Sequence, residues 1–434
     1  MNTSSYSVYI QGIVKFGLAY GVVSLLSRWI NSNTILSAPE TLVKYGLLGG
    51  IGYAVMGAIA LFLFGLIAPS IQKRFPNALT IGDILYERLD RRSYWFAMLV
   101  LVITSFDYLL IQVLSIGIIV HLLLKIPSYI GLLIFLLYCY VLFGLGGMKR
   151  IHKFKAIHIS IVFAAIILIP VYFFIKEGIY PVYDGLTLYH PYLLYFKDTY
   201  ILLFVLTGLI VSIGQLLIDR STWQRIYVIE PSKIRSSFFM TGIIWSAIPL
   251  AFTSITLITI HNQGFEGVNS ILNQLVEKVD SAFLIILFIG CCFSIIASTT
   301  GAELHATSIM IVRNILAVYF NWDSKQQLKK TYLAAGALCL ALFFTSIALS
   351  PTLVSIIFFF GKIYAAAIPT MLVVIFYKKT VPKYLPYCSL AGGLFSNIPI
   401  YGASNLTAIW ISFSLSSFFI VCYLAINQIG KKPE

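Results

Sequence analysis

The sequence predicts an all-α polytopic membrane protein, and two observations support this fold class. The chain has 434 residues, of which 59% are hydrophobic and only 11% are charged, whereas soluble domains carry about 25% charged residues. The hydrophobic residues occur in blocks of roughly 20, the length that a helix needs to cross a hydrocarbon core of about 30 Å. These blocks lack the alternating pattern of a membrane β-barrel, so helices must satisfy the backbone hydrogen bonds.

We expect about twelve transmembrane helices and no appended soluble domain. The expected spans are 9–45, 47–70, 93–125, 128–147, 155–176, 199–225, 235–260, 281–313, 331–350, 353–377, 384–402 and 406–427. Five spans precede the long loop at 177–198, and five more run from 199 to 377. We therefore expect a first five-helix half in 1–176, a second in 199–377 and two peripheral helices in 384–427.

The net charge of +14 is explained by the positions of the basic residues and not by a nucleic-acid partner. Lys and Arg gather in short loops such as KRIHKFK (149–155) and KQQLKK (325–330), while the intervening loops are richer in acids. If the N-terminus is cytoplasmic, every basic loop lies on the cytoplasmic side, as topology rules require. We expect a multi-pass protein of the cell membrane, surrounded by lipid, with both termini in the cytoplasm.

Two of the expected spans carry polar interruptions. The first contains four poor helix formers, Asn31 to Thr34, followed by Pro39, which predicts a break near 30–39. The sixth contains IDRSTWQR (218–225). In lipid, a broken helix is tolerated only where it lines a cavity or is buried in protein. Broken helices that open two five-helix halves predict an inverted-repeat transporter whose site lies at the break.

The eighth span carries six hydroxyl residues within SIIASTTGAELHATS. Ser298 and Thr299 can lean toward one point, and such oxygens suit a hard cation. The alternative is that these hydroxyls bond their own helix carbonyls and let helices approach closely. At the first break, Asn31, Asn33 and Thr34 can hydrogen-bond a polar solute, or they can be simple cap and turn residues.

Charged residues within the spans need partners. Asp107 lies deep in the third span and requires a counter-ion or a proton, for which Arg28 and Lys362 are the candidates. Asp219 lies near the end of its span, where an ion pair with the arginines that follow it is the alternative to a functional role. The sequence has no HExxH, GxSxG or phosphate-loop motif, so we expect neither an enzyme nor a bound cofactor.

Several stretches together resemble the sodium:solute symporter superfamily and, within it, the urea active transporter branch. The matching stretches are KRFPNALTIGDILYER (73–88), IDRSTWQR with the following WSAIPLAF (245–252), and ASTTGAELHATSIMIVRNI (297–315). Their order and spacing agree over most of the chain. The resemblance implies a LeuT-type fold of two inverted five-helix repeats. It also implies alternating-access import of a small polar solute, urea or a related amide or amine, coupled to Na⁺ or H⁺.

The resemblance also implies a set of sodium ligands. By position, the hydroxyl ligands fall on Ser298 and Thr299. The carbonyl ligands fall on Ile295 in the same span and on Ser27 and Ile30 in the first span.

The solute-lining positions implied by the resemblance fall on both interrupted spans. In the first they are Asn31, Asn33 and Thr34, and in the sixth they are Asp219 and Trp223.

Two residues depart from the superfamily pattern. Asn314 stands where an Asp is usual, and Arg28 lies between two implied carbonyl ligands, where a guanidinium aimed at the site would repel sodium. Proton coupling through Asp107 or Glu303 is therefore the alternative to sodium coupling. A second hypothesis is a transport-inactive membrane sensor or partner subunit that retains the symporter fold.

Overall fold

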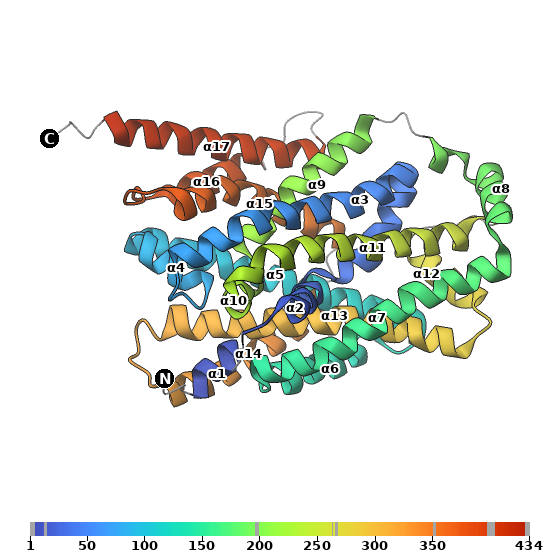
Figure 1. The fold of residues 1–434 in the computed structure, drawn as a ribbon, viewed down its shortest axis with the longest axis horizontal. Coiled ribbons are helices and arrows are strands. Elements are labelled where there is room, and N and C mark those ends of the chain that lie inside the picture. The colour runs from blue at the N-terminus through green and yellow to red at the C-terminus, as the bar shows by residue number, and fades with distance from the viewer. Residues whose placement is uncertain are drawn as a thin grey trace.

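The computed structural model describes residues 5–12, 15–195, 199–262, 264, 268–349, 353–396 and 404–429. Within these ranges the regular elements are helices, and an isolated β-bridge joins Phe16 to Ile229. Figure 1 shows the helices running mostly along the long axis of the molecule. The prediction of an all-α fold is therefore confirmed.

The elements follow one another along the chain with short connections. They are α1 (Ser5–Gln11), α2 (Leu18–Trp29), α3 (Ser32–Arg74), α4 (Ile81–Arg88), α5 (Arg91–Leu124), α6 (Ser128–Cys139), η1 (Tyr140–Gly144), α7 (Gly147–Glu177), α8 (Ile179–Tyr189), η2 (Pro191–Leu194), α9 (Thr199–Ile218), α10 (Arg220–Val228), η3 (Pro231–Lys233), α11 (Ile234–Ile260), α12 (Val268–Lys278), α13 (Ala282–Met310), η4 (Ile311–Leu316), α14 (Ser324–Leu349), α15 (Leu353–Phe376), α16 (Leu385–Phe395) and α17 (Asn405–Ile429).

Nine helices in the described part of the chain are long and apolar enough to cross a membrane, and two shorter apolar helices accompany them. The number of predicted spans is larger because α3 contains more than one. At Gly46 the backbone leaves helical geometry with φ 71°, a conformation that favours glycine. The first part of α3 therefore completes the first predicted span, and the remainder forms the second.

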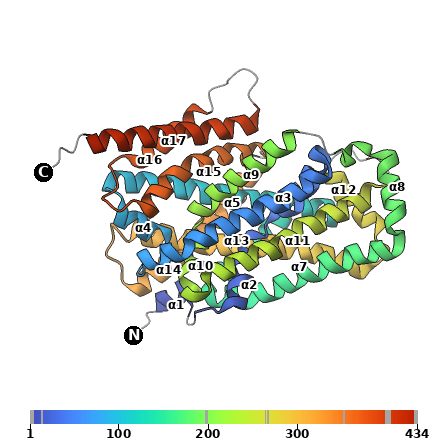
Figure 2. The same cartoon turned by 45° about the horizontal axis from the view of Figure 1, so that its top comes forward.

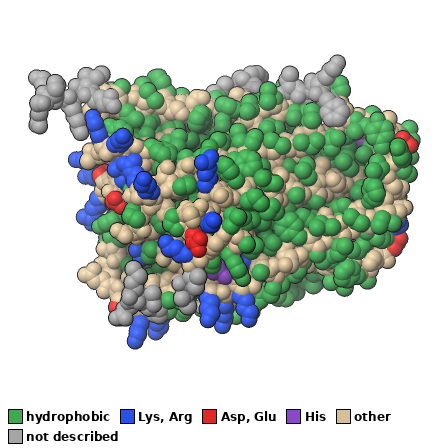
Figure 3. Space-filling model, in the orientation of Figure 1, with side chains coloured by type: hydrophobic (Ala, Val, Ile, Leu, Met, Phe, Trp, Pro, Cys, Tyr) green, Lys and Arg blue, Asp and Glu red, His purple; other side chains and the backbone are tan. Residues whose placement is uncertain are grey.

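The surface is that of a protein embedded in lipid. Figure 3 shows hydrophobic side chains over most of the visible face, with Lys and Arg gathered toward one end. That end carries α1, α4 and the last turns of α17 in Figure 1, whereas α8 lies at the opposite end. Basic side chains at one boundary of an apolar belt are the arrangement predicted from the loops.

The packing of α3 against α11 forms the largest helix contact and positions one aromatic residue of the site. Glycines of α3 allow this close approach, as small residues do between membrane helices. A Cβ on Gly57 would lie 2.1 Å from the Trp245 ring, and one on Gly65 would lie 2.7 Å from Phe238 Cβ. Figure 2 shows α16 and α17 at the edge of the bundle, beside α15.

Candidate solute and cation site

The first helix break occupies two residues. Helix α2 ends at Trp29, and Ile30 and Asn31 are both extended, with ψ 111° and 179°. Asn31 then caps α3, because its side chain accepts from the Thr34 amide (3.3 Å) while the Thr34 hydroxyl accepts from the Asn31 amide (3.4 Å). This reciprocal capping box keeps the following residues helical, so Pro39 lies inside α3.

The backbone groups freed by this break are paired by side chains from other helices. Trp245 Nε1 donates to the Trp29 carbonyl (2.8 Å), the Thr299 hydroxyl donates to the Ile30 carbonyl (2.5 Å), and the Ser32 amide donates to Gln112 Oε1 (3.0 Å). An unpaired backbone group within a membrane protein costs several kcal/mol. Helices α5, α11 and α13 therefore fix the geometry of the break.

Three of the implied sodium ligands converge. The Thr299 hydroxyl oxygen lies 2.5 Å from the Ile30 carbonyl oxygen and 3.0 Å from the Ile295 carbonyl oxygen. The adjacent Ser298 hydroxyl is buried and has no hydrogen-bond partner in the described structure. The Thr299 hydroxyl donates to both carbonyls, and its bond to Ile295 is the back-bond to the same helix that the alternative interpretation expects. A hard cation would bind these oxygens in place of the two hydrogen bonds.

The remaining implied ligand, Ser27, lies on α2 one turn before the break. Its hydroxyl donates to the Ser24 carbonyl (2.8 Å). Two cationic side chains also bind Ser24: the Arg225 guanidinium donates to its carbonyl (2.8 Å), and the Lys155 ammonium to its hydroxyl (3.2 Å). Sequence reasoning missed both cations, because Lys155 begins a predicted span and Arg225 was placed near the interface.

A cavity of about 220 Å³ adjoins the break. Its walls come from α2, α3, α9, α11, α15 and α17 and from the break itself. Polar groups on these walls are mainly amides and hydroxyls, namely Asn31, Asn33, Ser37, Thr41, Thr207, Ser212 and Gln215, and the aromatic wall includes Trp29, Tyr53 and Trp245. The lining residues with acidic or basic side chains in the described structure are Glu40 and Lys44, of opposite charge.

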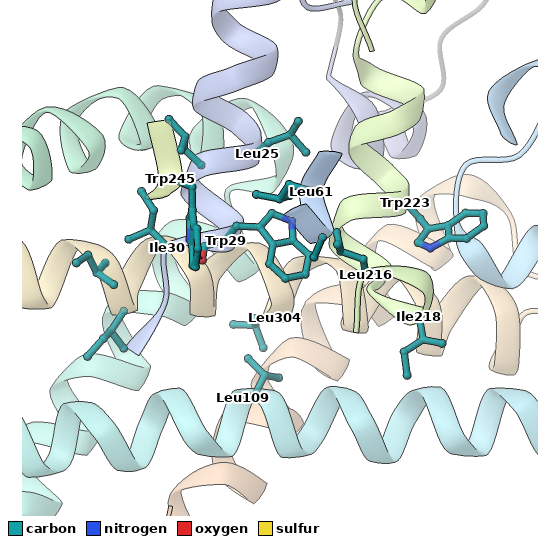
Figure 4. Close-up of a cluster of buried hydrophobic side chains, with 14 of the residues drawn as sticks. Leu25, Trp29, Ile30, Leu61, Leu109, Leu216, Ile218, Trp223, Trp245 and Leu304 are labelled. Carbon is teal, nitrogen blue, oxygen red and sulfur yellow. The ribbon is translucent and has the colours of Figure 1, made fainter. Parts of the chain in front are cut away.

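The implied solute-lining residues take different positions. Asn31 and Asn33 line the cavity, whereas Thr34 is fully buried in the cap. Trp223 is not among the lining residues: it donates to the Leu217 carbonyl (3.0 Å) and packs against Phe64. Figure 4 shows Trp29 and Trp245 around the end of α2, with Trp223 set apart.

The second helix break is made at Asp219, between α9 and α10. Asp219 is extended, with ψ 103°, and its carboxylate accepts from the Thr222 amide (2.7 Å), which caps α10. Aspartate is a favoured capping residue, and its charge complements the positive end of the helix dipole.

A chain of buried charges joins this break to the first one. Arg28 Nε donates to both oxygens of Asp219 (3.0 and 3.1 Å), and Arg28 Nη2 contacts Asp219 and lies 3.1 Å from Glu303 Oε2. Arg220 donates to Glu303 Oε1 (2.9 Å from Nε). The order is therefore Asp219, Arg28, Glu303, Arg220, with two charges of each sign.

The alternative interpretation of Asp219, a local ion pair with the arginines that follow it, is wrong. Arg220 turns to Glu303 and to the Thr104 hydroxyl (2.9 Å), and Arg225 turns to Ser24 and Ser221. Burial explains the outcome, because a carboxylate removed from water needs a close counter-ion and satisfied oxygens. The Arg28 guanidinium, from α2, supplies the positive charge and the hydrogen-bond donors that the Asp219 carboxylate needs.

Arg28 has no hydrogen bond to the implied cation ligands among the described contacts. Its guanidinium carbon lies 3.9 Å from the centre of the Tyr108 ring, and the Tyr108 hydroxyl accepts from Asn31 Nδ2 (3.1 Å). The guanidinium is therefore held among Tyr108, Asp219 and Glu303, and the Ile30 carbonyl faces Thr299 instead. The first break thus accommodates an arginine beside the oxygen cluster.

Asp107 has another partner than predicted. Its carboxylate accepts from the Tyr364 hydroxyl (3.4 Å), and its second oxygen has no hydrogen-bond partner in the described structure. Arg28 pairs elsewhere because Tyr108, about 100° further round α5, takes the position that faces it. The predicted pair of Asp107 with Arg28 does not form, and a pair with Lys362 stays a prediction.

Asn314, the other departure from the family pattern, lies at the basic end of the molecule. Its Nδ2 donates to Asp83 (2.9 Å), and its Oδ1 accepts from the Thr80 hydroxyl (2.9 Å). Arg313 also donates to Asp83 (3.0 Å). The amide therefore ties the loop before α4 to η4, and a carboxylate there would face Asp83.

No family model matches the chain. A curated relative, "Urea-proton symporter DUR3" of Oryza sativa subsp. japonica, is 22% identical over 347 residues, which cover 71% of this chain and 47% of the relative. "Probable urea active transporter 1" of Schizosaccharomyces pombe is 23% identical over 282 residues, covering 60% of this chain and 40% of the relative. The chain spans less than half the length of each of these transporters.

Solved structures match nearly the whole chain. A Na⁺-coupled sialic acid symporter, solved in a substrate-bound outward-open state, matches with TM-score 0.81 at 16% identity, covering 98% of this chain and 93% of that one. The fold is of the LeuT type. Mhp1, a nucleobase-cation-symport-1 family transporter, matches with TM-score 0.61 at 10% identity, covering 96% of this chain and 94% of that one. MhsT in complex with L-phenylalanine matches with TM-score 0.54 at 12% identity, covering 95% of this chain and 99% of that one. These findings are consistent with the sodium:solute symporter superfamily, and the relatives are transporters, not enzymes.

Proposed function

We propose that the chain is a cation-coupled secondary symporter that imports a small neutral polar solute, urea or a related amide, by alternating access. The observation that carries the proposal is the adjacency of two features at one helix break. The cavity bears Asn31 and Asn33 on its wall, and the oxygen cluster of Ile30, Ile295 and Thr299 begins at the preceding residue. Solute and cation would therefore bind to neighbouring parts of the same backbone.

The charges at the site favour a neutral solute over an amine. Asp219, the acid that best suits an amine, is saturated by Arg28 and by the Thr222 amide. The cavity offers amide and hydroxyl groups, which donate and accept hydrogen bonds as an amide solute requires. The acidic and basic lining residues of the described structure, Glu40 and Lys44, carry opposite charges. The printed names of both curated relatives refer to urea, which supports the same solute class.

The coupling ion is proposed to bind at the oxygen cluster if it is sodium. Ser298 and Thr299 supply hydroxyls, and Ile30 and Ile295 supply carbonyls, while the guanidinium nearest to them is turned toward acids. If the ion is a proton, Asp107 is the favoured carrier, because the Tyr364 hydroxyl binds its carboxylate and no ion pair holds it in the described structure. Glu303 is less suited, since two arginines hold it.

We infer the membrane arrangement from the same features. The two broken helices open the proposed halves 1–176 and 199–377, and the helices of 384–427 lie at the edge of the bundle. The end that gathers Lys and Arg is assigned to the cytoplasm, with both termini, in the cell membrane. The hypothesis of a transport-inactive sensor loses two of the observations that motivated it, because Arg28 and Asn314 both have partners that explain them.

The test is uptake of radiolabelled urea by proteoliposomes under an imposed sodium gradient, a proton gradient or no gradient. Accumulation that requires one of the two gradients is expected. Sodium-driven accumulation supports the oxygen cluster, and accumulation driven only by protons supports an intramembrane carboxylate. Urea, formamide and acetamide that fail to enter under every gradient would contradict the proposed solute class.

A further inference from the structure

The buried charge chain contains a guanidinium-shaped pocket that the protein fills with its own side chain. We propose that Asp219, Glu303 and the Tyr108 ring form a cation-binding site whose resident ligand is the Arg28 guanidinium. Occupancy of this site holds the two helix breaks in a fixed position relative to each other. The site is specific for a planar, forked cation. The part of the proposal that concerns transport depends on the proposed function, whereas the binding site does not.

The geometry is that of a built recognition site. Arg28 Nε lies 3.0 and 3.1 Å from the two oxygens of Asp219, and Nη2 lies 3.1 Å from Glu303 Oε2. The guanidinium carbon stacks over Tyr108 at 3.9 Å. Forked donors on carboxylates, combined with stacking on an aromatic ring, distinguish guanidinium from a point charge such as an ammonium.

The three walls of the site come from different parts of the fold. Asp219 is the break residue between α9 and α10, Glu303 belongs to α13, and Tyr108 belongs to α5. Arg28 itself lies two residues before the first break. The Arg28 side chain therefore connects both helix breaks to α5 and α13. Its interactions fix the orientation of the broken helices relative to the rest of the bundle.

The site also reaches the cavity through one hydrogen bond. The Tyr108 hydroxyl accepts from Asn31 Nδ2 (3.1 Å), and Asn31 lines the cavity wall. A change at Arg28 is thus transmitted to a solute-lining residue through the ring on which the guanidinium stacks. Arg28 is accordingly a positioning residue for the solute.

Charge balance predicts the effect of shortening Arg28. In Arg28→Ala, Asp219 loses its hydrogen-bonded counter-ion and Glu303 keeps only Arg220, while Arg225 stays bound to Ser24 and Ser221. Two buried carboxylates then face an empty volume of guanidinium shape. Such a site should bind guanidinium or methylguanidinium from solution. The buried Arg28 Nη1, which has no hydrogen-bond partner in the described structure, shows that the pocket holds the group without needing every donor.

The experiment compares the thermal melting of purified full-length variants, with guanidinium, methylguanidinium or tetramethylammonium chloride added at millimolar concentration. Arg28→Ala is expected to melt lower than the unsubstituted protein. Guanidinium and methylguanidinium should raise its melting temperature by several degrees in a saturable manner, whereas tetramethylammonium, which has no donors, should not. In proteoliposomes, guanidinium should also restore part of the urea uptake that Arg28→Ala loses.

Two controls keep the result specific. Arg313→Ala removes the arginine of the half-buried Arg313–Asp83 pair (3.0 Å) at the basic end of the molecule, and it should show no rise with guanidinium. The double variant Arg28→Ala, Asp219→Ala leaves Glu303 balanced by Arg220, so it should fold without the ligand and should also show no rise. If Arg28→Ala alone cannot be purified, the double variant is the reference. Restoring Asp219 in it should yield a protein that folds only when guanidinium is present.

The outcomes separate the two proposals. Equal melting shifts in Arg28→Ala, Arg313→Ala and the double variant would overturn the binding site. A specific melting shift without restored uptake, in a protein whose unsubstituted form transports urea, would overturn the positioning role. A specific melting shift in a protein that transports no solute at all would support the site while contradicting the proposed function.

Discussion

The two helix breaks are constructed in different ways. At the first break, between α2 and α3, the freed backbone groups are paired by neutral side chains: an indole, a hydroxyl and an amide. At the second break, between α9 and α10, the cap is a carboxylate, and its counter-ion is an arginine of the first broken helix. The side chains that pair the backbone at the second break therefore include a charged group, whereas those at the first break are neutral.

This difference suggests a division of roles. A neutral hydrogen bond contributes about 1 kcal/mol net, so the pairs at the first break can exchange for solute or cation contacts at modest cost. Removing one partner of a buried ion pair costs about 3–5 kcal/mol, so the second break is expected to stay fixed. We interpret the first break as the binding element and the second as the anchor against which it is held.

The largest effect on stability is expected when the carboxylate of the second break is neutralised. Asp219→Asn leaves Arg28 with only Glu303 as a counter-ion, and it should lower the free energy of unfolding by about 3–5 kcal/mol. Thermal melting in detergent measures the loss. The matched control, Asp280→Asn, breaks the solvent-exposed pair with Lys176 and should change nothing measurable, because exposed pairs contribute little. Equal, small effects in both variants would show that the second break is no anchor.

A smaller effect, confined to the cation, is expected at the first break. The double variant Ser298→Ala, Thr299→Ala removes the hydroxyls beside the Ile30 carbonyl. It should lower uptake and raise the half-saturating cation concentration roughly tenfold, since about 1.4 kcal/mol corresponds to a factor of ten. Thr256→Ala is the control, because that hydroxyl bonds only the Phe252 carbonyl of its own helix among described contacts. Unchanged cation dependence in the double variant would refute the cation site.

A further neutral pair tests the solute side of the same break. Trp245→Phe keeps an aromatic ring but leaves the Trp29 carbonyl without its donor, which costs about 1–3 kcal/mol. It should lower the melting temperature and raise the half-saturating urea concentration. Trp95→Phe, at a ring that stacks on Tyr319 away from the cavity, should leave both unchanged. If the two substitutions behave alike, the indole hydrogen bond does not shape the solute site.

The smallest effect is expected far from both breaks. Asn314→Asp introduces the residue usual in the superfamily that the sequence resembles, but it places a carboxylate beside Asp83 and removes an amide donor. The cost at neutral pH should be below about 1 kcal/mol, because Arg313 shares the site. The cost should shrink as the pH is lowered, since a protonated carboxyl can donate where the amide did. A melting temperature that falls with acidification relative to the unsubstituted protein would contradict this explanation.

Most of the architecture could be predicted from the sequence. Blocks of apolar residues determine spans because lipid permits few alternatives to a helix. The break itself was predictable from poor helix formers, but its position was not. Asn31 and Thr34 could either lengthen the interruption or cap the next helix. The structure shows the cap, which confines the break to Ile30 and Asn31.

The pairing of charges could not be predicted in the same way. Arg28 and Asp219 are 191 positions apart in the chain, so no local periodicity connects them, and their contact depends on how the two halves pack. One signal was available: Arg28, Asp219, Arg220 and Glu303 sum to zero charge. That balance is what a dry interior requires, and it would have favoured a shared network over a local ion pair at Asp219.

The most direct test of the account is counterflow of radiolabelled urea in proteoliposomes loaded with unlabelled urea, without any ion gradient. The unsubstituted protein should show a transient accumulation of label, and Asn31→Ala, which loses the amide shared by cavity and Tyr108, should lose most of it. Counterflow that is absent from the unsubstituted protein, or that is undiminished in Asn31→Ala, would contradict the assignment of the first helix break as the solute site.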